Sequence, residues 1–267
     1  MSAQLSTRDR LTIGVRMGAT PWAVKLALGI SALAWAILLA LIARGHADAA
    51  ALYRDAGLVW VVLGLICASL AFQQVGDEFA NRDELRCRLL PAGRTEWLWQ
   101  TLVTRGCEVA AAWVIWAVYV LLAGIGFHGA PALAGALVAP LGALAVASLL
   151  GVVLATLFQG PVTGWGAYAV LVLSLVGLRG TTVAVSPLDG WEQALAASPW
   201  CASERLLRFV LGMPSTGPGA GMLVGTVAAW LVGGALVLVG AWRWRLSRVS
   251  LAGTSVRQRR LRYYRGM

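Results

Sequence analysis

The sequence predicts an all-α membrane protein with six transmembrane helices, an amphipathic N-terminal interfacial helix, and both termini in the cytoplasm. Three observations lead to this prediction. The 267 residues are 59% hydrophobic and 13% charged, with a mean hydropathy of +0.73, whereas soluble domains are about 25% charged. Apolar runs long enough to cross the hydrocarbon core, which takes about 20 residues, recur along the chain. The basic residues gather in three segments that a six-span topology places on one side of the membrane.

The predicted elements follow one another in a simple order. Three arginines alternate with apolar residues within residues 1–21, which predicts an amphipathic helix lying on the membrane surface. The transmembrane domain covers residues 22–242, and its first span carries Lys25 near the start, where the long side chain can extend to the interface. The six predicted spans cover residues 22–43, 57–73, 107–127, 131–158, 161–178 and 222–242.

The distribution of charge predicts the orientation. Four basic residues lie in the chain up to Lys25, five in the connection 74–106 and eight in the tail 243–267, whereas the opposite side has five arginines balanced by five carboxylates. The net charge of +10 therefore lies on the cytoplasmic side. Because the tail directly follows a span, we expect it to bind anionic lipid headgroups rather than nucleic acid. Its arginines are Arg243, Arg245, Arg248, Arg257, Arg259, Arg260, Arg262 and Arg265.

Several residues within the spans predict how the helices pack. Gly233 and Ala229 have the small-x-x-x-small spacing that allows helices to approach closely, either within one bundle or at the seam of a dimer. Pro140 predicts a kink in the fourth span, because proline cannot donate to the helix. Arg105 and Glu108 stand one turn apart, and we expect an interfacial ion pair there rather than a proton-binding site.

The chain carries few residues that could drive or catalyse a reaction. Its only lysine, Lys25, is followed by Leu26, so the G-x-x-x-x-G-K-[ST] phosphate loop cannot be formed. Hydrolase, metalloprotease and EF-hand motifs are absent from the sequence, and its four cysteines lack metal-ligand spacing. We therefore expect a chain that is not an enzyme, that holds no cofactor or metal, and that takes its energy from another polypeptide.

The connection at residues 74–106 is the most informative segment. Acidic residues come first, leucines follow at helical spacing, and Pro91 ends the run before a new helix from Arg94. This pattern predicts two short helices on either side of a Pro-Gly elbow on the cytoplasmic face. Connections of this length are usually functional; an ordinary solvated loop is the alternative.

This connection and the layout of the whole chain resemble the permease subunits of bacterial type-two ABC exporters. The residues that carry the resemblance are Glu78, Leu85, Leu89, Leu90, Pro91, Gly93 and Arg94. The chain departs from the family at Arg82 and Asp83, where a Gly-Thr is common. The resemblance implies an outer segment with half-inserted helices at residues 179–220, and a coupling loop that docks a separate ATPase. The docking residues would be Asp77, Glu78, Glu84, Leu85, Arg86, Leu89, Leu90, Pro91 and Arg94.

The resemblance further implies a multi-pass permease of the bacterial cytoplasmic membrane. Its partners would be a second permease copy or paralogue and a P-loop ATPase subunit, which would bind ATP and Mg²⁺. The apolar, tryptophan-rich spans favour a lipophilic or amphiphilic substrate that moves outward. Two other classes stay open: a non-transporting anchor or assembly subunit that recruits cytoplasmic proteins through the same connection, and a polytopic membrane enzyme.

Overall fold

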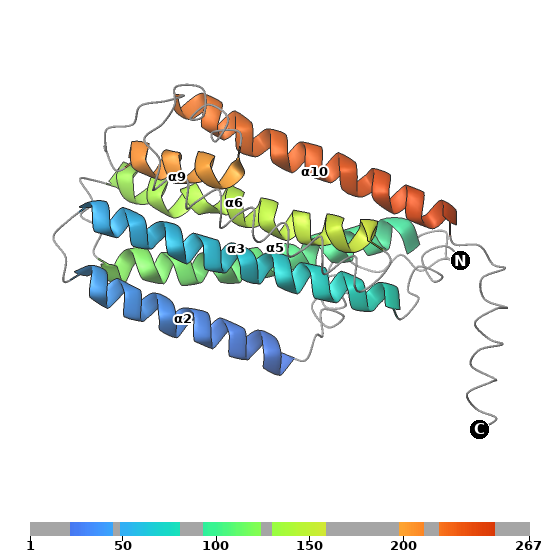
Figure 1. Ribbon diagram of the computed structural model, residues 1–267, viewed down its shortest axis with the longest axis horizontal. Helices are drawn as coiled ribbons and strands as arrows, with labels where there is room; N and C mark the ends of the chain where they lie inside the picture. Colours follow the sequence, from blue (N-terminus) through green and yellow to red (C-terminus); the bar gives the residue numbers. More distant parts are fainter. Residues whose placement is uncertain are drawn as a thin grey trace.

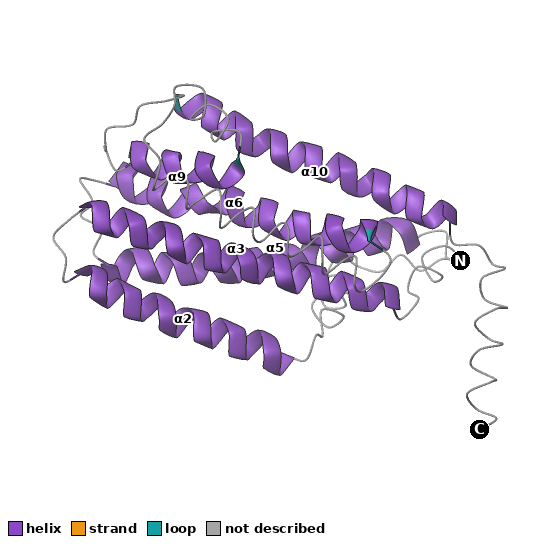
Figure 2. Cartoon of the chain, in the orientation of Figure 1, coloured by secondary structure: helices purple, strands orange, loops and turns teal. Residues whose placement is uncertain are grey.

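The computed structural model describes residues 22–44, 49–80, 93–123, 130–158, 198–210 and 219–248. In these ranges every regular element is a helix, as Figure 2 shows, which confirms the all-α prediction for this part of the chain. The helices are α2 (Trp22–Arg44), α3 (Ala49–Ala80), α5 (Gly93–Ala123), α6 (Ala130–Leu157), α9 (Pro199–Val210) and α10 (Ala220–Arg248).

Five of these helices, all except α9, are long and apolar enough to cross a membrane. An α-helix satisfies its backbone hydrogen bonds internally, which hydrocarbon surroundings require. The chain is accordingly a multi-pass membrane protein. The remaining predicted span at 161–178 and the predicted interfacial helix at 1–21 lie outside the described residues.

Two spans are longer than the sequence predicts. Helices α3 and α5 have 32 and 31 residues, which corresponds to about 45–50 Å at 1.5 Å per residue, well beyond a hydrocarbon core of about 30 Å. The prediction that the third span starts near residue 107, after a separate short helix from Arg94, is wrong, because α5 runs unbroken from Gly93. The polar residues of this stretch do not interrupt the helix, since Trp97 and Arg105 are buried against other helices.

The helices lie side by side in one elongated bundle (Figure 1). Helices α3 and α6 form its centre and pack against each other most extensively; α2 lies against α5 and α3 at one edge, and α10 against α6 and α9 at the other. Burial follows this order, because 61% of the apolar segment of α3 and 56% of that of α6 are buried, against 17% for α2 and 6% for α10. The exposed side chains of the edge helices include Leu26, Leu38 and Leu236, as a lipid-facing surface requires.

The two ends of the bundle carry different elements. Helices α2 and α5 begin on the right of Figure 1, and helices α3, α6 and α10 finish there. We call this end of the bundle the α3–α5 end. Helix α9 lies toward the opposite end, which we call the α9 end. The chain between α6 and α9 therefore connects opposite ends of the bundle, as a span at 161–178 would require.

Two hydrophobic clusters fill the bundle. The first surrounds an aromatic group on α3 and α5, in which the ring centres of Trp60 and Trp116 are 5.1 Å apart and those of Trp116 and Tyr119 are 5.4 Å apart. Leu207 of α9 belongs to the same cluster. The second lies toward the α3–α5 end, where Trp97 of α5 is stacked on Trp242 of α10.

Glycines permit the close approach of α6 to its neighbours. A Cβ atom added at Gly151 would collide with the backbone carbonyl oxygen of Ala68 on α3, and one added at Gly135 would lie 2.6 Å from a methyl group of Val210 on α9. Small residues thus allow the close helix contacts of the bundle centre. Gly233, which the sequence marks for close packing, has no described atom within 4 Å of an added Cβ.

We expect Gly151→Ala to lower the thermal stability of the purified protein in detergent. The new methyl group meets a backbone atom that cannot rotate away, and overpacking of this kind costs about 1–3 kcal/mol. Gly225→Ala on α10 is the matched control, because its Cβ enters open space and alanine favours the helix by about 1 kcal/mol. Equal melting temperatures for the two variants would contradict close packing of α3 on α6.

Candidate functional site

A buried polar cluster joins three helices toward the α3–α5 end. It consists of Lys25 on α2, Gln74 on α3, and Arg105 and Glu108 on α5. Lys25 Nζ donates to Glu108 Oε1 at 2.9 Å, and Arg105 Nη1 donates to Glu108 Oε2 at 2.5 Å. Gln74 Oε1 accepts hydrogen bonds from Lys25 Nζ, at 3.4 Å, and from Arg105 Nη2. One carboxylate and one amide oxygen therefore hold two cations.

This cluster, which we call the Glu108 cluster, is shielded from the surroundings. The exposed fractions of the side chains of Lys25, Arg105 and Glu108 are 16%, 8% and 10%. Charges in such an environment are stable only when they are paired and hydrogen-bonded. Because Glu108 is the acceptor for both cations, its removal would leave two buried positive charges close together. Glu108 is thus the residue on which the pairing of α2 with α5 depends.

The sequence predicted part of the Glu108 cluster. The ion pair of Arg105 with Glu108, three residues apart on α5, is confirmed. Lys25, whose side chain the sequence allows to extend to the interface, binds Glu108 through its ammonium group, a contact that the sequence did not predict. Gln74 was not predicted, since a single amide near the end of a span carries no spacing signal.

The predicted ATPase-docking residues are described only in part. Asp77 and Glu78 lie in the last turn of α3, and Arg94 lies in the first turn of α5. These turns are at the same end of the bundle (Figure 1), on either side of the connection 81–92. The other docking residues fall outside the described residues, and they are Glu84, Leu85, Arg86, Leu89, Leu90 and Pro91.

The end of α10 is attached to the bundle through a buried arginine. Arg245 Nη1 donates to the backbone oxygens of Ala155, at 3.4 Å, and Thr156, at 3.0 Å, in the last turn of α6. These carbonyls have no partner within α6, and a cation is favourable at a helix C-terminus. Arg245 therefore differs from its exposed neighbour Arg243 in the predicted lipid-binding tail. Arg248 closes α10, and the tail arginines beyond it lie outside the described residues.

An aromatic stack lies beside this attachment. The ring centres of Trp97 and Trp242 are 3.9 Å apart and the ring planes differ by 11°. Both rings are buried, together with Val75 of α3 and Val152 of α6. The first turns of α5 are thereby packed onto the last turns of α10, close to the connection that the sequence marks as functional.

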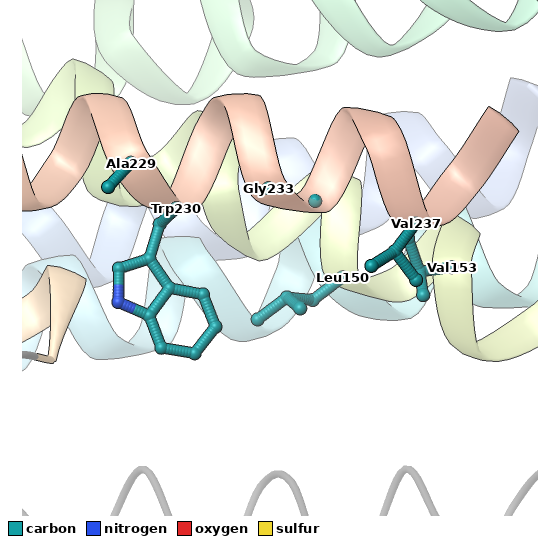
Figure 3. A pocket seen from close by; sticks show the side chains of 7 residues that line it. Leu150, Val153, Ala229, Trp230, Gly233 and Val237 are labelled. Atoms are coloured by element: carbon teal, nitrogen blue, oxygen red, sulfur yellow. The ribbon is translucent and has the colours of Figure 1, made fainter. Parts of the chain in front are cut away.

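An apolar groove runs between α6 and α10 (Figure 3). Its volume is about 350 Å³. Leu150 and Val153 of α6 face Trp230 and Val237 of α10, and the glycines of α10 keep the space open. Among the described lining residues, Trp230 alone has a side chain with a hydrogen-bonding group, so the groove suits an acyl chain or another apolar group. The described lining residues are Leu150, Val153, Ala229, Trp230, Gly233, Gly234 and Val237.

Helix α9 lies within the segment 179–220 that the sequence assigns to the outer face. Its buried side includes Ala202 and Leu207, and its residue Trp200 approaches Gly64 of α3. Cys201 is also buried, and burial followed by the charge of nearby Glu204 raises the pKa of its thiol above the ordinary value. The Cys201 thiol therefore stays protonated at neutral pH. The described residues contain no group of three or more side chains that could hold a metal ion.

No family model and no curated protein matches this chain.

Glu108→Gln should destabilise the bundle far more than Lys25→Met. The first change removes the carboxylate that pairs with both Lys25 and Arg105, and breaking a buried pair costs about 3–5 kcal/mol. Lys25→Met leaves Arg105 paired with Glu108, and this pair carries no net charge. Melting curves of both variants in the same detergent measure this order. Equal losses, or a larger loss for Lys25→Met, would show that Glu108 is not the shared counterion.

Proposed function

We propose that this chain is the membrane-spanning permease subunit of an ABC exporter, in which a separate subunit hydrolyses ATP. The observation that carries the proposal is the construction of the α3–α5 end. The helices on either side of the connection 81–92 are joined to α2 by the Glu108 cluster and to α10 by the stack of Trp97 on Trp242. A force applied at this connection would therefore reach the helices at both edges of the bundle.

The energy source is proposed to be a P-loop ATPase subunit that binds ATP and Mg²⁺. The only lysine of the chain is Lys25, which is part of the Glu108 cluster and has no phosphate-loop sequence around it. In this proposal the α3–α5 end faces the cytoplasm, in agreement with the excess of basic residues in the segments on that side. Asp77, Glu78 and Arg94 would then stand at the rim of the ATPase-docking surface.

The substrate class is proposed to be lipophilic or amphiphilic. The groove between α6 and α10 is apolar along its length, and the outward-facing side chains of α2 and α10 are mainly aliphatic and aromatic. A hydrophilic ion or sugar would lose its hydration there without gaining hydrogen-bond partners. The second permease copy or paralogue would provide the other wall of the pathway.

Purification from native membranes in a mild detergent tests the proposal. We expect a stoichiometric subunit with a phosphate loop to co-elute, and its ATP hydrolysis to depend on this chain. Co-elution with a partner that lacks any nucleotide site would instead support a non-transporting anchor or assembly subunit. Elution of the chain alone, with an activity of its own, would support a membrane enzyme; either result would overturn the proposal.

Charge reversal in the docking surface should weaken the coupling of the ATPase subunit to this chain without unfolding the bundle. We expect Glu84→Arg and Arg94→Glu to lower ATPase activity that depends on this chain, because polar pairing with the ATPase subunit would turn into repulsion. The melting temperature should stay unchanged, since neither residue is a member of the Glu108 cluster. Arg243→Glu is the matched control, because it reverses the charge of an exposed arginine on α10 and not on the helices that flank the connection. Unaltered hydrolysis and transport in both docking variants would contradict the docking role.

A further inference from the structure

Pro140 interrupts the hydrogen-bonding of α6 in the interior of the bundle. The helix continues through this residue from Ala130 to Leu157, and Pro140 is among its fully buried residues. Proline has no N–H group, so the carbonyl oxygen of Ala136, four residues earlier, loses its helical donor. In apolar surroundings a carbonyl in this position needs a replacement partner.

Two tryptophans of α5 supply donors at this point. Trp116 Nε1 donates to the backbone oxygen of Ala136 at 3.0 Å, and Trp113 Nε1 donates to that of Leu137 at 2.8 Å. The two tryptophans are three residues apart and so lie on the same face of α5. Both bonds cross from one helix to the other, and Trp116 is completely buried. The backbone carbonyls of Ala136 and Leu137, which lie close to Pro140, therefore accept hydrogen bonds from side chains of α5.

The contacts of α6 change on passing Pro140. Before the proline, α6 is bonded to the tryptophans of α5, and Gly135 packs against Val210 of α9. After the proline, Gly151 packs on Ala68 of α3, and the last turn accepts hydrogen bonds from Arg245 of α10. The hydrogen-bond partners of α6 on other helices thus differ on the two sides of Pro140.

We propose that Pro140 is a hinge in α6 and that Trp113 and Trp116 are the lock that fixes its angle. With both indole bonds formed, the segment 130–139 moves with α5. When the bonds open, the freed carbonyls allow α6 to bend at the proline, as kinked helices do at this residue type. The inference concerns this chain alone and stands independently of the proposed ATP-driven transport.

A double-mutant cycle measured by amide hydrogen exchange tests the lock. We expect Trp116→Phe to speed the exchange of α6 amides around Pro140 by roughly tenfold, the effect of losing one buried hydrogen bond. In a Pro140→Ala background the new N–H group supplies the Ala136 carbonyl, and Trp116→Phe should then change exchange less than about threefold. A tenfold effect of Trp116→Phe in both backgrounds would show that the indole only fills space and would overturn the proposal.

Trp60→Phe is the matched control for this cycle. Trp60 contacts Trp116 in the same aromatic cluster, but its Nε1 has no hydrogen-bond partner among the described residues. Its effect should be the same with and without Pro140. If Trp116→Phe fails to fold, replacing the indole of Trp116 by a benzothiophene removes the N–H group and keeps the shape. Faster exchange for this replacement, reversed by Pro140→Ala, is the expected result; unchanged exchange would overturn the lock.

Discussion

Polar groups inside this bundle must find their partners on neighbouring helices, because the hydrocarbon around it offers neither hydrogen bonds nor counterions. Glu108 pairs two cations from α2 and α5, Arg245 caps the last turn of α6, and Trp113 and Trp116 bind carbonyls beside Pro140. In each case the partner, or one of the partners, belongs to another helix. These polar contacts between helices therefore contribute to which helices lie side by side.

These attachments are unevenly distributed along the bundle. Toward the α3–α5 end, α2 is joined to α3 and α5 through the Glu108 cluster, α5 to α10 through stacked tryptophans, and α6 to α10 through Arg245. Toward the α9 end, the described helices are held by aromatic packing and by small residues such as Gly135. Under the proposed function, the α3–α5 end, where the Glu108 cluster lies, would receive the motion of the ATPase and pass it to the helices at both edges.

The sequence predicted the helical class and the positions of five spans, because runs of apolar residues of membrane length have few other structures open to them. It predicted the pair of Arg105 with Glu108 from their spacing on one helix. Contacts between helices were beyond such an argument. The contact of Lys25 with Glu108 and the role of Gln74 depend on which helices meet. The helix that the sequence predicts from Arg94 was expected to be short, whereas it continues into the third span as α5.

The pairing of α2 with α5 through opposite charges is tested most directly by exchanging them. Glu108→Lys alone places three cations together, whereas the double change Lys25→Glu with Glu108→Lys restores one pair of opposite charges between α2 and α5. We predict that the single variant loses the cooperative melting transition in detergent and that the double variant regains a transition, at a melting temperature above that of the single variant. A double variant no more stable than the single one would contradict the account.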